Sequence, residues 1–166
     1  MSFDIRDVAG VDWSERADEG YAALIESARA LVAGESDLIA NAANLSSLVY
    51  HALPRLNWVG FYLYDGTELV VGPFQGKPAC VRIPLDRGVC GAAARTRSTQ
   101  RVPDVHAVPD HIACDSESRS ELVVPLVRDG ELIGVFDLDS PVPDRFGDAD
   151  QSGLEAIAAV LVDAVA

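Results

Sequence analysis

The spacing of apolar residues changes after residue 53, and this change limits the folds that the chain can adopt. Upstream, residues 15–33 and 36–53 repeat apolar side chains every three or four positions, as amphipathic helices do. Downstream, residues 57–64 are aromatic and β-branched, and Asp65-Gly66 then favours a hairpin turn. The chain therefore begins with two helices whose apolar faces need a partner, and strands follow directly.

The remaining segments predict an antiparallel meander between terminal helices. Asp129-Gly130 is a second hairpin turn, between residues 122–127 and 132–138, and residues 148–162 return to helical spacing. Shorter elements are expected as strands at residues 69–71, 81–84 and 100–102 and as a small-residue helix at residues 88–97. This order predicts an α+β domain with a central antiparallel sheet, the N- and C-terminal helices on one face and a ligand pocket under inserted loops on the other.

Size and charge narrow the class of protein. With 166 residues, 49% of them hydrophobic, the chain is expected to form one domain in which residues 1–14 are an N-terminal extension. The formal net charge is −13, which produces a field that repels phosphate backbones and anionic lipids. We therefore expect neither a nucleic-acid nor a membrane partner.

The start of the chain does not resemble a secretory signal. Residues 1–10 include Asp4 and Asp7 and lack an apolar core. No apolar run approaches the ~18 residues needed to span a bilayer. The sequence therefore predicts a cytoplasmic protein, in which thiols stay reduced unless they take part in a redox cycle.

The three cysteines, Cys80, Cys90 and Cys114, lie within one stretch of the sequence. An odd number of thiols argues against a static disulfide scaffold. The spacings contain no Cys-x-x-Cys pair, and His106 and His111 are irregularly placed, which disfavours a structural zinc site. Thiol redox chemistry, metal binding and coincidence remain as alternatives.

The contexts of two of these thiols differ. Cys90 stands at the expected start of a helix, where it can act as a small apolar side chain or as a thiol whose pKa the helix dipole lowers. Cys114 lies in a polar loop, residues 103–118, that offers little packing. An accessible thiol with a second thiol on another loop is the arrangement of an attacking and a resolving cysteine.

Three acidic residues are expected to meet across the second hairpin. Asp137 and Asp139 occupy positions i and i+2, so in an extended strand both point to one face. Glu121 opens the partner strand and faces Asp139 in one possible register. Such a cluster predicts a site for a metal ion or an ammonium group, or a carboxyl kept protonated as a proton donor. The alternative is that the strand ends at Phe136 and both aspartates are solvated turn residues.

Aromatic residues of the first predicted strand extend this picture. Trp58 and Tyr62 share one face with Gly60, whereas Val59 and Phe61 belong to the other face. The second set indicates core. An indole and a phenol on the opposite face indicate either packing under a helix or the wall of a small apolar pocket.

Five segments, taken together, closely resemble the free methionine-(R)-sulfoxide reductases, single-domain enzymes of the GAF fold. These segments are residues 73–80, 88–91, 104–106, 110–115 and 137–141. The resemblance runs from about Tyr21 to the C-terminus. Arg87 stands where the family would have lysine, and Phe136 stands where a smaller aliphatic residue is usual.

The resemblance implies reduction of free methionine (R)-sulfoxide through a cysteine sulfenic acid and an intramolecular disulfide. By position, Cys114 corresponds to the attacking thiol and Cys80 to the resolving one, while Cys90 assists or exchanges with them. The substrate would be held by Glu121, Asp137 and Asp139, and its methyl-sulfoxide end enclosed by Trp58 and Tyr62. The resemblance further implies a thioredoxin-type reductant, a homodimer, and neither a cofactor nor a metal. A non-catalytic sensor module of the same fold remains the alternative.

Overall fold

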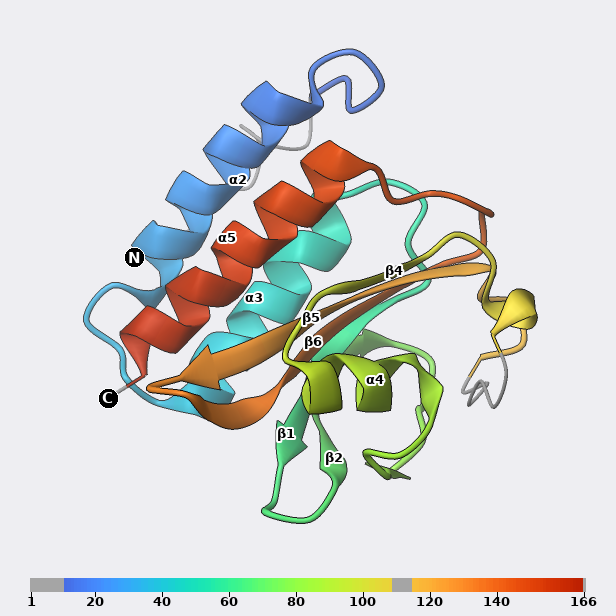
Figure 1. Cartoon of the computed structure of the whole chain (residues 1–166). Helices are drawn as coiled ribbons and strands as arrows, with labels where there is room; N and C mark the ends of the chain where they lie inside the picture. Colours follow the sequence, from blue (N-terminus) through green and yellow to red (C-terminus); the bar gives the residue numbers. More distant parts are fainter. Residues whose placement is uncertain (1–10, 109–114, 166) are drawn as a thin grey trace.

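The computed structural model describes residues 11–108 and 115–165 (Figure 1). Their elements, in chain order, are α2 (Ala17–Val32), α3 (Leu38–Ala52), β1 (Trp58–Tyr64), β2 (Leu69–Gly76), β3 (Arg82–Ile83), α4 (Gly88–Thr96), β4 (Gln100–Val102), the 3₁₀ helix η1 (Val105–Ala107), β5 (Ser120–Arg128), β6 (Glu131–Ser140) and α5 (Asp148–Ala164). The strands form one sheet in the order β3-β2-β1-β6-β5-β4, and every neighbouring pair is antiparallel.

The helices divide between the two sides of this sheet (Figure 1). On one side, α3 and α5 pack against the strands, and α2 packs across both of these helices. On the other side, α4 contacts β4, β5 and β6. We call these sides the helix face and the pocket face. The predicted α+β fold, with its terminal helices on one face, is confirmed.

Local sequence signals account for the ends of the elements. The Asp37 side chain caps α3 by accepting a hydrogen bond of 2.8 Å from the backbone N–H of Ala40. In the second hairpin, Asp129 and Gly130 adopt φ of 52° and 83°, as a type I′ turn requires. The main difference from the sequence-based expectation is length, because β2 continues to Gly76 and β6 to Ser140.

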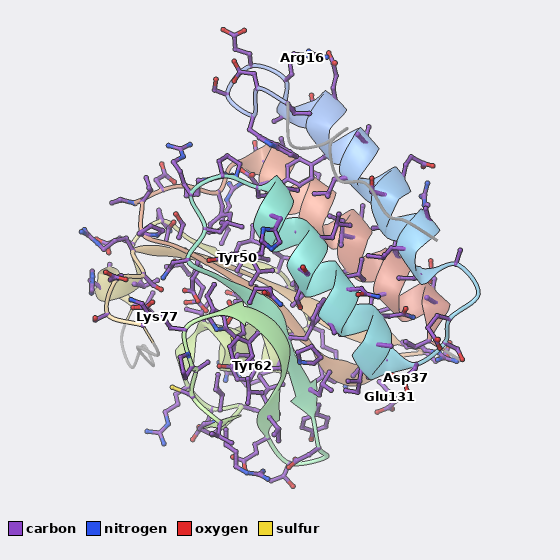
Figure 2. The ribbon with its side chains drawn as sticks, turned by 180° about the vertical axis from the view of Figure 1, so that it is seen from behind. Arg16, Asp37, Tyr50, Tyr62, Lys77 and Glu131 are labelled. Carbon is purple, nitrogen blue, oxygen red and sulfur yellow. The ribbon has the colours of Figure 1, made fainter. Side chains whose placement is uncertain are left out.

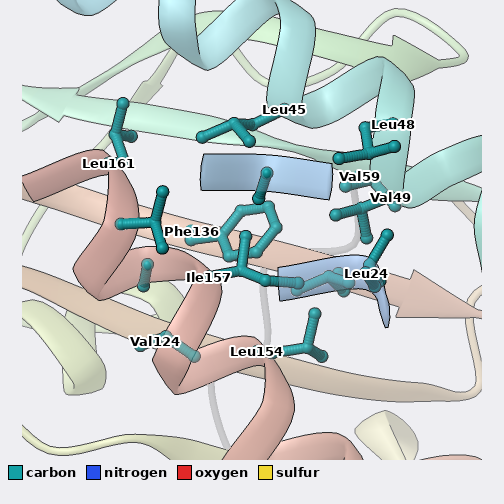
Figure 3. Close-up of a cluster of buried hydrophobic side chains, with 14 of the residues drawn as sticks. Leu24, Leu45, Leu48, Val49, Val59, Val124, Phe136, Leu154, Ile157 and Leu161 are labelled. Atoms are coloured by element: carbon teal, nitrogen blue, oxygen red, sulfur yellow. The ribbon is translucent and has the colours of Figure 1, made fainter. Parts of the chain in front are cut away.

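The helix face carries the larger apolar core. Phe136 is fully buried there and stacks on Phe61, with ring centroids 4.5 Å apart. Figure 3 shows Phe136 surrounded by side chains from other elements, among them Leu45 of α3 and Ile157 of α5. The large ring at position 136 therefore fills the main core and does not enter the pocket.

Alternation along β1 separates the two faces as the sequence predicts. Val59 and Phe61 belong to the core of the helix face, whereas Trp58 and Tyr62 belong to the smaller cluster of the pocket face. Figure 2 shows Tyr62 and Lys77 on the side of the molecule away from α2. Among the described residues, no helix is long and apolar enough to cross a bilayer.

Candidate active site

A pocket opens on the pocket face, between the sheet, the start of α4 and the segment that joins β2 to β3. Its space, counted to the open mouth, is about 530 Å³. Six of the residues singled out from the sequence line it: Trp58, Tyr62, Cys90, Glu121, Asp137 and Asp139.

The three acidic residues meet as the hairpin argument predicts. Glu121 on β5 pairs directly with Asp139 on β6, so the predicted register is confirmed. Because β6 continues to Ser140, the alternative in which the strand ends at Phe136 is wrong. Glu121 and Asp137 are each only 5% exposed. The paired strands therefore hold these carboxyl groups close together where little water can solvate them.

This environment favours protonated carboxyls. Burial raises the pKa of Glu121 well above its ordinary value, and Asp139 raises it further. Burial likewise raises the pKa of Asp137, with added repulsion from Asp139 and Glu121. Among the described residues, the buried Oδ1 of Asp137 has no hydrogen-bond partner. The cluster is therefore prepared to receive a cation or to keep a proton.

Cys90 is a free thiol at the inner end of this cluster. It is 4% exposed, and its Sγ donates to Oε1 of Glu121 over 3.9 Å. Burial raises the pKa of Cys90 well above its usual range, and the charges of Asp137 and Glu121 raise it further. Of the two alternatives for Cys90, the small buried side chain is therefore confirmed and the lowered pKa is wrong. A helix terminus contributes at most about 2 kcal/mol, and here burial and two acids oppose it.

The other two cysteines are not both described. Cys80 is half-buried beside the pocket-face cluster and is disulfide-bonded. Cys114 and His111 lie outside the described residues. His106 is described and stands exposed on η1, away from any cluster of metal-ligating groups found in the described ranges.

The aromatic wall is built from stacked rings. The Trp58 ring lies between those of Tyr62 and Phe74, with centroids 5.7 Å and 5.2 Å away. Gly60 makes this possible, because a Cβ there would lie 2.3 Å from Cβ of Phe74 and 2.7 Å from the Trp58 ring. Burial, and then the charge of Asp137, raise the pKa of Tyr62, which keeps its hydroxyl protonated. The wall is largely apolar and has two polar tips, the Tyr62 hydroxyl and the Trp58 Nε1–H, which donates to the backbone carbonyl of Lys77 at 3.2 Å.

Lys77 and Asp115 lie at the mouth of the pocket, and the sequence did not identify either of them as a site residue. Lys77 forms ion pairs with Asp115, at 3.4 Å, and with Glu117. The Asp115 carboxylate also accepts a hydrogen bond of 3.2 Å from Asn57 Nδ2. These contacts tie the β2–β3 segment, which carries Cys80, to the chain that follows Cys114. One signal was available, because Lys77 is the only lysine of the sequence and lies in a segment that carries the family resemblance.

Known proteins share this architecture and much of this sequence. The family model described as "GAF domain" matches residues 37–165. The free methionine-R-sulfoxide reductase of Escherichia coli is 52% identical over 143 residues, which cover 86% of this chain and 87% of that protein.

Two solved structures extend the comparison. The free methionine-R-sulfoxide reductase of Neisseria meningitidis, solved in complex with its substrate, has a TM-score of 0.85 and 46% identity, and the match covers 89% of each chain. A Burkholderia vietnamiensis protein described as a GAF sensor has a TM-score of 0.87 and 67% identity, and covers 90% of this chain and 95% of its own. The fold, the pocket and these similarities lead to one conclusion: the chain belongs to the GAF-domain family and, within it, to the free methionine-R-sulfoxide reductases.

Proposed function

We propose that this protein reduces free L-methionine (R)-sulfoxide to methionine with electrons from its own cysteines. The observation that carries the proposal is the meeting of three carboxyl groups, on register-paired strands, with an aromatic wall in one pocket. Its relatives support the same conclusion, because one of them was solved with its substrate bound. No cofactor is required, since thiols supply both electrons.

The acidic cluster explains why the substrate is a free amino acid. A free methionine sulfoxide carries an ammonium group that a peptide-bound residue lacks. Glu121, Asp137 and Asp139 receive this ammonium, and Trp58 and Tyr62 enclose the methyl-sulfoxide end. The substrate carboxylate accepts hydrogen bonds from backbone N–H groups. The first turn of α4 supplies such donors at the pocket, where the side chain of Arg87 makes no capping hydrogen bond.

Proton placement follows from the raised pKa values. Attack on the sulfoxide sulfur places negative charge on its oxygen, which must be protonated as the S–O bond breaks. Burial and repulsion keep a carboxyl of Glu121 or Asp137 protonated in the pocket. That carboxyl donates the proton as a general acid.

The electrons come from two cysteines in two steps. The Cys114 thiolate attacks the substrate sulfur, methionine leaves, and Cys114 becomes a sulfenic acid. The Cys80 thiol then displaces water from it, which leaves a disulfide between the two sulfurs. Cys80 is disulfide-bonded while Cys90 is free, which supports Cys80 as the resolving thiol and Cys114 as its partner. Cys90, with its raised pKa, assists at the substrate or exchanges with this pair.

The cycle closes outside the pocket. A thioredoxin-type dithiol reduces the disulfide and restores both thiols, so that one sulfoxide and one dithiol give methionine, water and one disulfide. Such a reductant places the enzyme in the cytoplasm. We also propose a homodimer, in line with the family, and sedimentation velocity tests it.

The deciding assay offers separated R and S epimers, both free and peptide-bound, with a thioredoxin recycling system. We expect methionine only from the free R epimer. Without the recycling system, two thiols should be lost for each methionine formed. Saturable sulfoxide binding with all thiols intact would instead identify a sensor and overturn the proposal.

Cysteine variants test the assigned roles. Cys114→Ser should abolish methionine formation even in a single turnover, whereas Cys80→Ser should allow one turnover and then stop with Cys114 oxidised. Mass spectrometry after a sulfenic-acid trap measures that oxidation. Full multiple-turnover activity in Cys114→Ser would refute the assignment of the attacking thiol and leave the substrate assignment standing.

A further inference from the structure

The innermost groups of the pocket have a geometry that ammonium binding does not require. Sγ of Cys90, one carboxylate oxygen of Glu121 and one of Asp137 all lie within 4.8 Å of one another. They come from three different elements, α4, β5 and β6, and each residue is at most 5% exposed. Three ligand-type atoms from a packed helix and two paired strands therefore converge on one point.

One of these separations approaches that found around a tetrahedral metal. With a Zn–S bond of about 2.3 Å and a Zn–O bond of about 2.1 Å, sulfur and oxygen lie about 3.6 Å apart across the ion. The distance from Sγ of Cys90 to Oε1 of Glu121 is 3.9 Å. A shift of a few tenths of an ångström, within reach of rotamer adjustment, completes this part of the coordination sphere.

A second, independent observation points to a ligand. Oδ1 of Asp137 is buried and has no hydrogen-bond partner within the described parts of the chain. A buried acceptor left without a partner destabilises the folded state, and more so when it is charged. A cation bound between Asp137, Glu121 and Cys90 supplies the missing partner.

We propose that Cys90, Glu121 and Asp137 bind a divalent cation of borderline softness, with Zn²⁺ as the best match, and that this ion and the substrate ammonium exclude each other. A thiolate with two carboxylates suits Zn²⁺ better than Mg²⁺ or Ca²⁺, which prefer oxygen ligands alone. Three protein ligands leave the fourth position to water. The exclusion of substrate rests on the proposed function, whereas the binding of the metal does not.

Charge balance makes the binding depend on pH. The metal must displace the proton of the Cys90 thiol and any proton held by Glu121 or Asp137, so binding releases protons. Other titratable groups that face the site are Tyr62 on β1, Asp139 on β6, and Lys77 and Asp115 at the mouth. Because a metal ion binds the deprotonated forms of these groups, affinity should increase as pH rises.

The test uses the oxidised protein, in which Cys80 is disulfide-bonded and Cys90 is a free thiol. Titration with Co²⁺ at about pH 8 should give a thiolate-to-cobalt charge-transfer band that saturates at one ion per chain. Zn²⁺ should displace the band, and Mg²⁺ should not. Absence of this band, or its persistence in Cys90→Ser, would refute the site.

Two further variants keep the test independent of folding. Asp137→Asn preserves shape, so its circular dichroism should match the wild type while its affinity for Co²⁺ falls at least about tenfold. Asp163→Asn removes the same charge from an exposed position on α5, across the sheet, and should leave affinity unchanged. Equal affinities in a folded Asp137→Asn and in Asp163→Asn would contradict the assigned ligands.

Competition separates the metal site from the proposed function. Free methionine sulfoxide should raise the apparent Kd for Co²⁺ in proportion to its concentration, and Zn²⁺ should inhibit turnover in the same competitive manner. Additive binding of both would overturn the mutual exclusion. Metal binding in a protein without turnover would refute the proposed function alone, whereas turnover without the cobalt band would refute the metal site alone.

Discussion

The two faces of the sheet are made from alternate residues of the same strands, yet their chemistry is opposite. On β6, Phe136 points to the helix face, where it is fully buried among apolar side chains. Its neighbour Asp137 points to the pocket face, where it is buried with Glu121 beside it. One residue along the chain therefore separates a stabilising contact from a costly one.

The contrast shows that the two faces contribute oppositely to the stability of this fold. Burial of apolar surface and ring stacking on the helix face lower the free energy of the folded state. Burial of carboxyls on the pocket face raises it, because these groups lose water and repel one another. The stability of the helix face thus offsets the cost of burying carboxyl groups in the pocket, where they can bind a ligand.

The largest expected effect comes from breaking the helix face. Phe136→Ala removes a buried ring that stacks on Phe61 and should lower the free energy of unfolding by about 3–5 kcal/mol. Asp137→Asn, one position along the strand, should lower the free energy of unfolding by less than about 1 kcal/mol near neutral pH, or should raise it. Urea unfolding measures both. Equal losses would show that the two faces contribute alike and contradict the comparison.

The next effect concerns the pocket face and appears in activity. Glu121→Gln and Asp139→Asn should each reduce kcat/KM for free methionine sulfoxide by at least about 100-fold, because ammonium binding and proton donation depend on this cluster. The folded state should remain intact by circular dichroism. As a control, Asp163→Asn removes one charge from the opposite side of the sheet and should retain activity within about twofold. Wild-type kinetics in Asp139→Asn would contradict the strand-face argument.

A smaller effect appears in how stability depends on pH. The folded protein keeps protons on Glu121 and Asp137 above their ordinary pKa values of 4.5 and 3.8, where the unfolded chain has released them. Because the folded state binds more protons, stability falls as pH rises from about 4 toward the raised pKa values, by about 1.4 kcal/mol per pH unit for each retained proton.

Two variants separate the contribution of Glu121 to this pH dependence from that of the other acidic residues. Glu121→Gln should flatten the decline in unfolding free energy that begins above about pH 5, while Asp163→Asn should leave the slope unchanged. Urea unfolding at several pH values supplies the measurement. A slope in Glu121→Gln as steep as in the wild type would show that Glu121 is ionised in the folded protein.

Much of the fold could be predicted because local patterns agree with the tertiary arrangement. The spacing of apolar residues located both N-terminal helices, and Asp129-Gly130 located the second hairpin. Strand alternation placed Trp58 and Tyr62 opposite Phe61, and the hairpin register placed Glu121 opposite Asp139. These signals are local or span a single turn, so a sequence can express them.

The mouth of the pocket could not be predicted in the same way. Lys77 meets Asp115 across a separation of 38 residues, and Asn57 reaches Asp115 across 58. Such contacts depend on how two loops pass over the sheet, and no periodic pattern in the sequence encodes that path. The pKa of Cys90 was missed for a related reason, because the acids that raise it come from β5 and β6.

The amino-acid order alone settles which residues share a side of a strand, where the turns fall, and which carboxyls are opposite each other. These properties follow from the two-residue repeat of a strand and from turn chemistry, both of which act over short distances. Packing in three dimensions decides how deeply Glu121, Asp137 and Cys90 are buried, and hence which protons they keep. Desolvation and repulsion depend on every neighbour in space, and only the assembled fold brings those neighbours together.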